Sequence, residues 1–460
     1  MNSKTNFCYA TVLIAGIFFF SSLALAQEKQ KMEISKQLRE RVMASIKEEE
    51  LVEFIKEIIR AGQPDAENPF DLSLPGGKEE GVALVVADKI RGMGLDVQLH
   101  AEIAGRPNVV GFKKGSTGKP SLILNDHLDT WPAGDRSKWT MTNHDPYNPT
   151  MHGRFLYGRG AADTRGNLAC QLYAVKILMK LGLKFKGDLI LAYTVDEERG
   201  VNNGARFLLE KKGLKADYAL VAEPTTWRKN GEKGTAIAIA HGGTCILELE
   251  TKGKSMHLQI PDAGINAIVK MASLLSELDK TKFTYNPSAS KVPGSTLPKI
   301  SVSSIESTKA EERQFVPNFC KVQLAVVGLV PGMTKESVLS DVQNVINKLK
   351  AKDKDFDAEV KLSKIWNGFM PPTIESDENS LHLNALMQSY EEVTGKKPVL
   401  FRKNSYTDAV AFSLQGIPSL TFGAGDDAWS PINEFIDMDQ AMIVTKTYAL
   451  AIARILGVQD

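Results

Sequence analysis

Cysteine is scarce in this chain, with 4 residues in 460. Cys8 lies in an apolar N-terminal segment, while Cys170, Cys245 and Cys320 are widely spaced along the rest of the sequence. An odd number of cysteines at such spacings argues against a disulfide framework and against a CxxC zinc site. We therefore expect the three later thiols to be buried in apolar surroundings.

An excess of either charge is also missing, because 56 lysine and arginine residues are balanced by 55 aspartate and glutamate residues. A chain without a strongly basic surface has no electrostatic reason to bind nucleic acid or a membrane surface. The sequence also lacks internal repeats and low-complexity tracts. We therefore expect no nucleic-acid partner and no membrane partner.

The apolar run from Thr11 to Ala26 is shorter than the ~20 residues that a membrane-spanning helix needs. Lys4 precedes the run, and it ends in Ala24-Leu25-Ala26, with the small residues that signal peptidase prefers. We expect residues 1–26 to be a cleaved signal peptide and the protein to be periplasmic or secreted. An uncleaved anchor is the alternative.

The remaining residues exceed the ~250–300 at which one hydrophobic core stops growing, so we expect two structural units. Apolar segments with strand character alternate with helical patterns; these segments are "SLILNDHLDT", "GDLILAYTV" and "ADYALVAEPT". This alternation predicts an α/β fold in which a mixed, mainly parallel sheet is flanked by helices.

The pattern changes near Ala240. Period-two alternation and separate helices follow, in "TAIAIAHGGTCILELETKGKS", "KISVSSIES" and "INAIVKMASLLSEL", and the α/β pattern resumes from Asp377. We therefore expect one domain built from residues 27–241 and 364–460. An α+β domain of residues 242–363 would be inserted into it.

Candidate metal ligands follow several of the expected strands: His127, Asp129, Asp163, Glu197, Glu198 and Glu223. Ligands bind beyond the carboxyl ends of strands in open α/β sheets. Each residue alone has an ordinary explanation, such as a turn or a structural hydrogen bond. Their occurrence together favours a metal site. One imidazole with several carboxylates suits Zn²⁺, with Mn²⁺ or Co²⁺ as alternatives.

Five motifs stand in the order and spacing of the M20 metallopeptidases, a family that the chain resembles over nearly its whole length: "NDHLDTWP", "LYGRGAADTRGN", "TVDEERG", "VAEPT" and "GKSMHLQIPDAGINAI". The resemblance implies a metal-binding catalytic domain and an inserted lid domain through which two chains form a homodimer. It also implies hydrolysis of an N-acyl amino compound or a short peptide.

The resemblance also implies roles for individual residues. His127 and Glu223 would bind one metal ion, Asp163 would bridge two and Glu198 would hold the other. Asp129 would orient His127, as metal-bound imidazoles generally require. Glu197 would be the general base toward a water molecule that the metal activates. His257 of the lid would stabilise the oxyanion.

The chain departs from the family pattern near its C-terminus, where relatives carry a metal-binding histidine. The segment "FGAGDDAWSPINEF" has Trp429 at that position. Asp426, Asp427 or Glu434 could substitute, or the site could hold one metal ion instead of two. Trp429 could instead line the pocket and contact a flat substrate.

The lid departs from the pattern too. Gln314 and Gly328 stand where relatives have an asparagine and an arginine for the oxyanion and the substrate carboxylate. Glycine cannot replace a guanidinium, so we expect a substrate without the usual free carboxylate. We expect Gln314, Asn266 and Trp429 to contact it. Arg402 or Lys403 could supply a cation, with an exposed basic loop as the alternative.

The sequence thus favours an exported, metal-dependent amide hydrolase. Two alternatives remain: a mononuclear enzyme with lyase-type chemistry and a catalytically silent binding protein on the same scaffold.

Overall fold

The structure is a computed structural model that describes residues 33–62, 79–200, 202–229, 232–292, 297–307, 314–364, 368–425 and 432–459. The expected signal peptide and Trp429, Asp426 and Asp427 lie outside these residues. None of the described helices has the length and apolar character needed to cross a membrane.

One part of the chain forms an eight-stranded sheet. In spatial order its strands are β1 (Asp96–Ala101), β2 (Pro107–Lys113), β6 (Gly187–Thr194), β3 (Gly118–His127), β7 (Tyr218–Val221), β17 (Ser419–Thr421), β10 (Ile237–His241) and β16 (Leu400–Lys403). The central strands β6, β3, β7 and β17 pair in parallel, while β1, β2 and β10 add antiparallel pairs. The predicted mixed α/β sheet is therefore confirmed.

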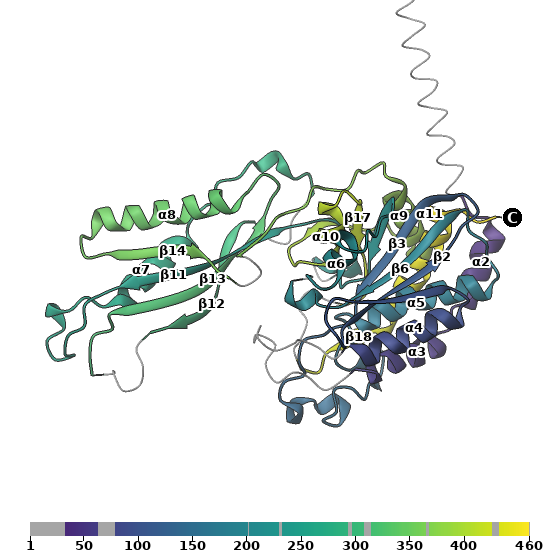
Figure 1. The fold of residues 1–460 in the computed structure, drawn as a ribbon, viewed down its shortest axis with the longest axis horizontal. Coiled ribbons are helices and arrows are strands. Elements are labelled where there is room, and N and C mark those ends of the chain that lie inside the picture. The colour runs from purple at the N-terminus through teal and green to yellow at the C-terminus, as the bar shows by residue number, and fades with distance from the viewer. Residues whose placement is uncertain are drawn as a thin grey trace, which may run out of the picture.

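Helices cover both faces of this sheet (Figure 1). One face packs against α2 (Lys36–Ser45), α3 (Glu48–Arg60), α4 (Glu80–Gly92), α5 (Arg165–Lys180), α9 (Leu381–Thr394) and α11 (Met438–Leu456). The other face packs against α6 (Ala205–Glu210) and α10 (Asp408–Leu414). Leu122 and Leu124 of β3 enter the first core, whereas Ile123 enters the second. Burial of both faces explains why these strands are apolar throughout.

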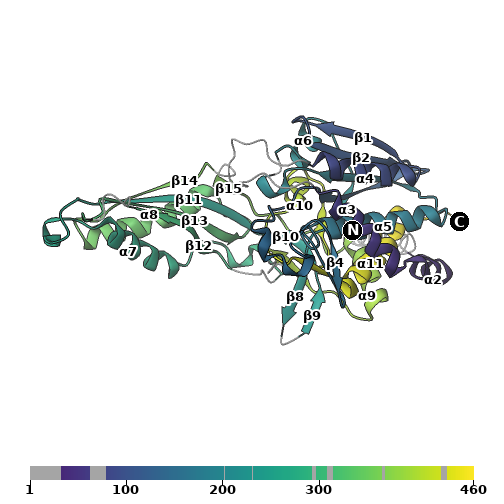
Figure 2. The ribbon, with the colours of Figure 1, turned by 90° about the horizontal axis from the view of Figure 1, so that it is seen from below.

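A second sheet projects from the first (Figures 1 and 2). It contains β12 (Lys299–Glu306), β13 (Phe319–Leu329), β11 (Gly243–Lys252), β14 (Asp357–Leu362) and the short β15 (Phe369–Met370), which pairs with β11. The helices α7 (Ala267–Asp279) and α8 (Lys335–Lys352) pack on one face. We call this second sheet with its two helices the lid.

The chain enters the lid directly from the first sheet. β10 ends at His241, and β11 begins at Gly243 in the other sheet, so the single alternating run of the sequence serves two sheets. The chain returns through β15, α9 and β16. Strands of the first sheet thus lie on both sides of the lid in the sequence.

The remaining elements are short. They are β4 (Thr150–His152), β5 (Phe155–Tyr157) and β18 (Phe435–Asp437) in a three-stranded sheet, the hairpin of β8 (Thr226–Lys229) and β9 (Glu232–Thr235), and the 3₁₀ turns η1 (Arg136–Lys138), η2 (Thr140–Thr142), η3 (Glu197–Arg199), η4 (Pro261–Ala263) and η5 (Pro287–Ala289). Cys170, Cys245 and Cys320 are free and buried, as predicted.

His382 is a buried group of α9 whose charge state depends on pH. Its ring stacks on Tyr218, with centroids 4.5 Å apart, and neither ring nitrogen has a hydrogen-bond partner among the described residues. Burial lowers the pKa of His382 to about 3. The unfolded chain, with a histidine pKa of ~6.5, therefore takes up a proton that the folded chain does not.

We predict that His382→Phe makes the protein less sensitive to acid. The folded pKa lies below the unfolded value, so the contribution of His382 to stability is complete above pH ~6.5 and is lost as the pH falls toward 3. The variant should gain roughly 2 kcal/mol relative to the wild type between pH 7.5 and pH 5. Denaturant unfolding at the two pH values measures this. The prediction is contradicted if the difference in free energy of unfolding between variant and wild type is the same at pH 7.5 and at pH 5.

Candidate metal centre and active-site cleft

The predicted site residues meet at one edge of the eight-stranded sheet. β3 ends at His127, β6 ends at Thr194 just before Asp196-Glu197-Glu198, and β7 ends at Val221 just before Glu223. These three strands are parallel neighbours, so their carboxyl ends lie side by side. The turn before α5 adds Asp163, and Gly160 in that turn has φ +81°, a conformation that favours glycine.

His127, Asp163 and Glu223 form the centre of the site. His127 Nε2 lies 3.3 Å from Asp163 Oδ1 and 3.5 Å from Glu223 Oε1, and one ligand atom from each residue lies within 4.8 Å of the others. Glu197 Oε2 is 3.9 Å from the same nitrogen. Glu198 is not part of the three-residue group, but it lines the same cleft.

Asp129 holds both the histidine and the acidic turn. Its carbonyl oxygen is 3.0 Å and its Oδ1 is 3.4 Å from His127 Nδ1. Its two carboxylate oxygens also accept the backbone N–H groups of Glu197 and Glu198, at 3.3 and 3.1 Å. Asp129 therefore leaves Nε2 of His127 facing the carboxylates and sets the position of the two glutamates.

The electrostatics of the cluster favour a bound cation. Burial and the charge of Glu223 raise the pKa of Glu197 well above its usual value, and burial and Asp163 do the same for Glu198. Burial opposes the protonation of His127, but the carboxylates of Asp129, Asp163 and Glu223 raise its pKa well above the usual value. These carboxylates repel one another, and a divalent cation would relieve the repulsion.

Two buried atoms support the same fit. His127 Nε2 and Glu198 Oε1 are buried and have no hydrogen-bond partner among the described residues; the nitrogen lies 3.3 Å from Asp163 Oδ1, and the Glu198 residue lines the cleft. Buried polar atoms are usually satisfied, so an unpaired imidazole nitrogen beside several carboxylates is a donor set that suits Zn²⁺.

Glu434 does not replace the missing histidine, one of the possibilities left open by the sequence. It is 1% exposed, and its Oε1 accepts the N–H groups of Ala162 and Asp163 at 2.8 and 2.9 Å. Its Oε2 accepts from Gly160 N and from Arg159, both at 2.8 Å. With these four contacts, Glu434 shapes the turn that presents Asp163.

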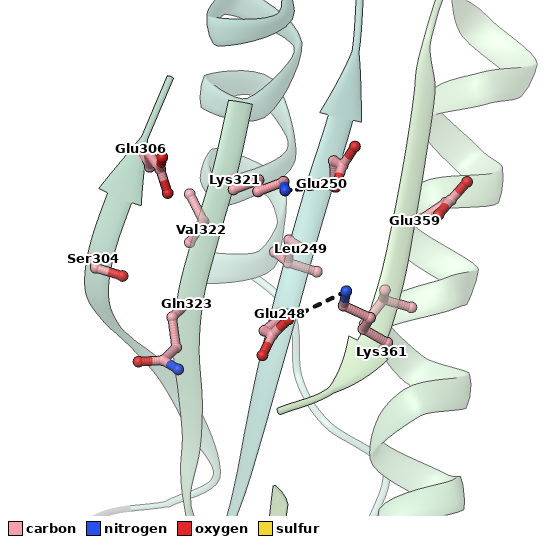
Figure 3. Close-up of a pocket in the computed structure, with 11 residues that line it drawn as sticks. Glu248, Leu249, Glu250, Ser304, Glu306, Lys321, Val322, Gln323, Glu359 and Lys361 are labelled. Atoms are coloured by element: carbon pink, nitrogen blue, oxygen red, sulfur yellow. Dashed lines mark ion pairs between the residues drawn. The ribbon is translucent and has the colours of Figure 1, made fainter. Parts of the chain in front are cut away.

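A cleft of about 540 Å³ opens over the cluster, between the first sheet and the lid. The lid contributes a mostly apolar wall of Thr244, Ile246, Ala325, Val327 and Met370. The same face of the lid sheet becomes charged farther from the cleft, where Lys361 pairs with Glu248 at 3.3 Å and Lys321 pairs with Glu250 at 3.6 Å (Figure 3). The part of the sheet over the cleft is thus the part without charges.

The lid residues His257, Asn266 and Gln314 lie at the opposite end of the lid sheet. Thr244 of β11 lines the cleft, and β11 runs away from it for roughly 26 Å to Lys252. Beyond this end His257 forms a bridge with Phe315, and Gln314 O accepts from Leu258 N at 3.0 Å. Asn266 caps α7 by accepting from the N–H groups of Ile268 and Val269.

Arg402 and Lys403 are not on an exposed loop, which corrects one alternative from the sequence. Both belong to β16 and are buried. Arg402 pairs with Glu375 at 3.1 Å. Lys403 lines the cleft and donates to Pro224 O at 2.7 Å.

Sequence reasoning missed Tyr406 and Asp408, which follow Lys403 in "NSYTDA". Tyr406 lines the cleft, and Asp408 is buried behind it, accepting hydrogen bonds from Thr194 and Asn125. Burial raises the pKa of Asp408 to about 6. The signal was weak, because a lone Thr-Asp pair before a helix is also ordinary capping sequence.

With the geometry established, comparison with known proteins decides the family. The model of peptidase family M20/M25/M40 matches residues 123–454. The chain belongs to this family. The resemblance predicted from the five motifs is thereby confirmed, and the chain is an M20 family amide hydrolase.

Individual relatives cover most of the chain. The N-formyl-4-amino-5-aminomethyl-2-methylpyrimidine deformylase of Bacillus subtilis (strain 168) is 26% identical over 411 residues, which are 86% of this chain and 92% of that protein. The crystal structure of human carnosine dipeptidase 1 has a TM-score of 0.70 at 19% identity and covers 91% of this chain and 99% of that one.

A third relative is the YXEP protein of Bacillus subtilis, described as a dinuclear metal-binding peptidase of the M20 family. Its structure has a TM-score of 0.60 at 15% identity and covers 90% of this chain and 99% of that one. At these identities the two structures establish the shared fold.

We predict that Zn²⁺ stabilises the protein and that His127→Ala removes this effect. A ligand that binds only the folded state at 100 times its dissociation constant adds ~2.7 kcal/mol of stability. The unfolding temperature is measured on chelator-treated protein with and without Zn²⁺. His152→Ala, which changes a surface histidine, is the control and should keep the full shift. An equal shift in His127→Ala would contradict the assignment.

Proposed function

We propose that the protein hydrolyses the amide bond of a small N-acyl compound or a short peptide, with Glu197 as the general base. The observation that carries this proposal is the position of Glu197. Its carboxylate is buried beside the candidate metal cluster and lines the cleft, 3.9 Å from His127 Nε2.

His127, Asp163 and Glu223 would hold the ion, and Glu198 would add a further carboxylate. Zn²⁺ suits this donor set, Mn²⁺ or Co²⁺ could replace it, and one or two ions would bind per chain. A divalent cation in such a site supplies Lewis acidity and lowers the pKa of a coordinated water toward ~7.

Glu197 moves the proton. Its Oε2 lies 3.9 Å from His127 Nε2, and Asp129 accepts its backbone N–H, so the carboxylate is held where it would meet a water molecule that attacks the substrate from the cluster. It accepts the proton of that water as the water attacks the amide carbonyl, and it then donates the proton to the leaving nitrogen.

The lid wall supports a substrate without a free carboxylate on that side. Ile246, Ala325, Val327 and Met370 provide no cation, and the expected arginine position is occupied by Gly328. A carboxylate placed there would lose its hydration without gaining a partner. The similarity to a deformylase named for an aminopyrimidine substrate agrees with a substrate of this kind.

We predict that Glu197→Gln abolishes turnover while metal binding remains. Glutamine keeps the size of the side chain but cannot accept the proton, so kcat should fall by at least about 10²-fold. The rate is measured on a panel of N-formyl, N-acyl and dipeptide substrates, with metal content measured in parallel. Glu210→Gln, on the surface of α6, is the matched control. Retained turnover in Glu197→Gln would refute the role.

We also propose a homodimer formed through the lid, in which the partner supplies His257 to the cleft. His257 lies far from the cleft of its own chain, and exposed apolar side chains surround that end of the lid: Leu258, Ile260, Ile268, Val269, Val302, Ile305 and Phe315. β12 is the edge strand of the lid sheet and is exposed along most of its length. An apolar patch beside an open sheet edge is typical of an interface.

We predict that two inactive variants restore activity when they are mixed. In a dimer of Glu197→Gln with His257→Ala, one of the two sites contains both intact residues. Random exchange of subunits should therefore restore about a quarter of wild-type activity. Activity is measured before and after co-refolding, with each variant alone as the control. No recovery, despite exchange shown by mixed dimers, would exclude the sharing of His257.

We also propose that the protein is exported. The apolar segment that ends at Ala26 would be removed, and the mature enzyme would act in the periplasm or outside the cell without membrane attachment.

A further inference from the structure

Glu197 and Glu198 lie between β6 and α6, in a segment whose described residues are 195–200, 202 and 203, and Asn108 of β2 contacts both Val195 and Asn203. We propose that Arg106 and Asn108, in the sequence "GRPNVV" at the start of β2, are positioning residues for the general base. This inference rests on the proposed role of Glu197. It assigns a function to a motif that neither contacts the cluster nor lines the cleft.

Arg106 holds the residue that precedes the base. Its NH1 group donates to Asp196 Oδ1 at 3.1 Å, and both side chains are buried. The other carboxylate oxygen, Asp196 Oδ2, accepts from Asn203 N at 3.2 Å and from Asn203 Nδ2 at 2.8 Å. The Asp196 side chain thereby links the beginning of the segment to its end, and Arg106, directly before β2, binds the same carboxylate.

Asn108, the second residue of β2, forms hydrogen bonds with the same segment. Its Oδ1 accepts from Val195 N at 3.0 Å, and its Nδ2 donates to Asn203 O at 2.9 Å. Arg106 directly precedes β2 and Asn108 is the second residue of β2, and both contact this one segment. Asn108 is completely buried. With Asp129 bound to the N–H groups of Glu197 and Glu198, the segment is held at both ends and in its middle.

The backbone conformation of Asp196 explains why these contacts are needed. Its φ is +68°, in the left-handed region that a non-glycine residue occupies at a cost of ~1 kcal/mol or more. A residue in this region persists when its surroundings hold it there. If Asp196 relaxed to a right-handed or extended conformation, the chain direction at Glu197 would change, and the carboxylate would leave the cluster.

The chemistry of the contact requires an arginine. The guanidinium of Arg106 also binds Glu79 through its NE and NH2 groups, at 2.6–3.1 Å, and Glu79 is 2% exposed. Two buried carboxylates on different sides of one cation match the planar fork of arginine, whereas a lysine ammonium cannot reach both in the same geometry. Glu79 thus orients Arg106 toward Asp196.

The test uses Arg106→Lys, which keeps the positive charge but loses the planar guanidinium that binds two carboxylates. We expect kcat to fall about 10- to 100-fold, the effect of a base displaced by roughly 1 Å, while KM and metal content stay near the wild-type values. The matched control is Arg454→Lys. Arg454 is equally buried and binds Glu392 and Ser389 between α11 and α9, so this change should lower stability without lowering kcat.

A double-mutant cycle separates positioning of the base from general damage. If Arg106 acts through Glu197, adding Arg106→Lys to Glu197→Gln should produce no further loss of the residual rate. If Arg106→Lys fails to fold, Asp196→Asn weakens the same contact from the other side and should give the same separation of kcat from KM.

Two results would overturn the inference: unchanged kcat in both Arg106→Lys and Asp196→Asn, or full additivity with Glu197→Gln. A fully active Glu197→Gln would instead overturn the proposed function, so the two failures are distinguishable.

Discussion

Mutual repulsion among buried carboxylates is the constraint on which the rest of this site depends. Asp163, Glu197 and Glu223 lie 3.3–3.9 Å from the imidazole nitrogen Nε2 of His127, and Glu198 lines the same cleft. Such a cluster is unfavourable without a compensating cation. The surrounding contacts hold these carboxylates in position: Glu434 shapes the turn of Asp163, and Asp129 binds the N–H groups of both glutamates.

The two sheets contribute different parts of the site. The eight-stranded sheet is buried on both faces, and its parallel strand ends present the cluster as a rigid edge. The lid sheet leaves one face open, apolar above the cleft and charged beyond it. In the proposed function, this apolar half disfavours a substrate with a free carboxylate, because the carboxylate would lose hydration there without gaining a partner. His257 lies beyond the far end of the lid sheet and does not line the cleft of its own chain, so we propose that it acts in the cleft of a second chain.

Much of the site was predictable, because the carboxyl ends of adjacent parallel strands must meet. That rule brought together His127, Glu197 and Glu223 from their positions after apolar runs. The contacts that hold them were not predictable in the same way. Glu434 binds a turn about 270 positions earlier, and Arg106 reaches Asp196 across 90 positions. Most acidic and basic residues in loops are exposed to solvent, and the sequence does not reveal which of them are buried.

The sequence by itself determined the α/β class, the change of pattern near Ala240, the family and the residues that gather at the strand ends. These follow from local periodicity and from short motifs, which depend on neighbouring residues. Only the tertiary structure decided that Glu434 is a support, that Lys403 lines the cleft, and that His257 lies away from it. Those facts depend on burial and on contacts between distant segments, and burial in turn decides whether a charge is solvated, paired or left to bind an ion.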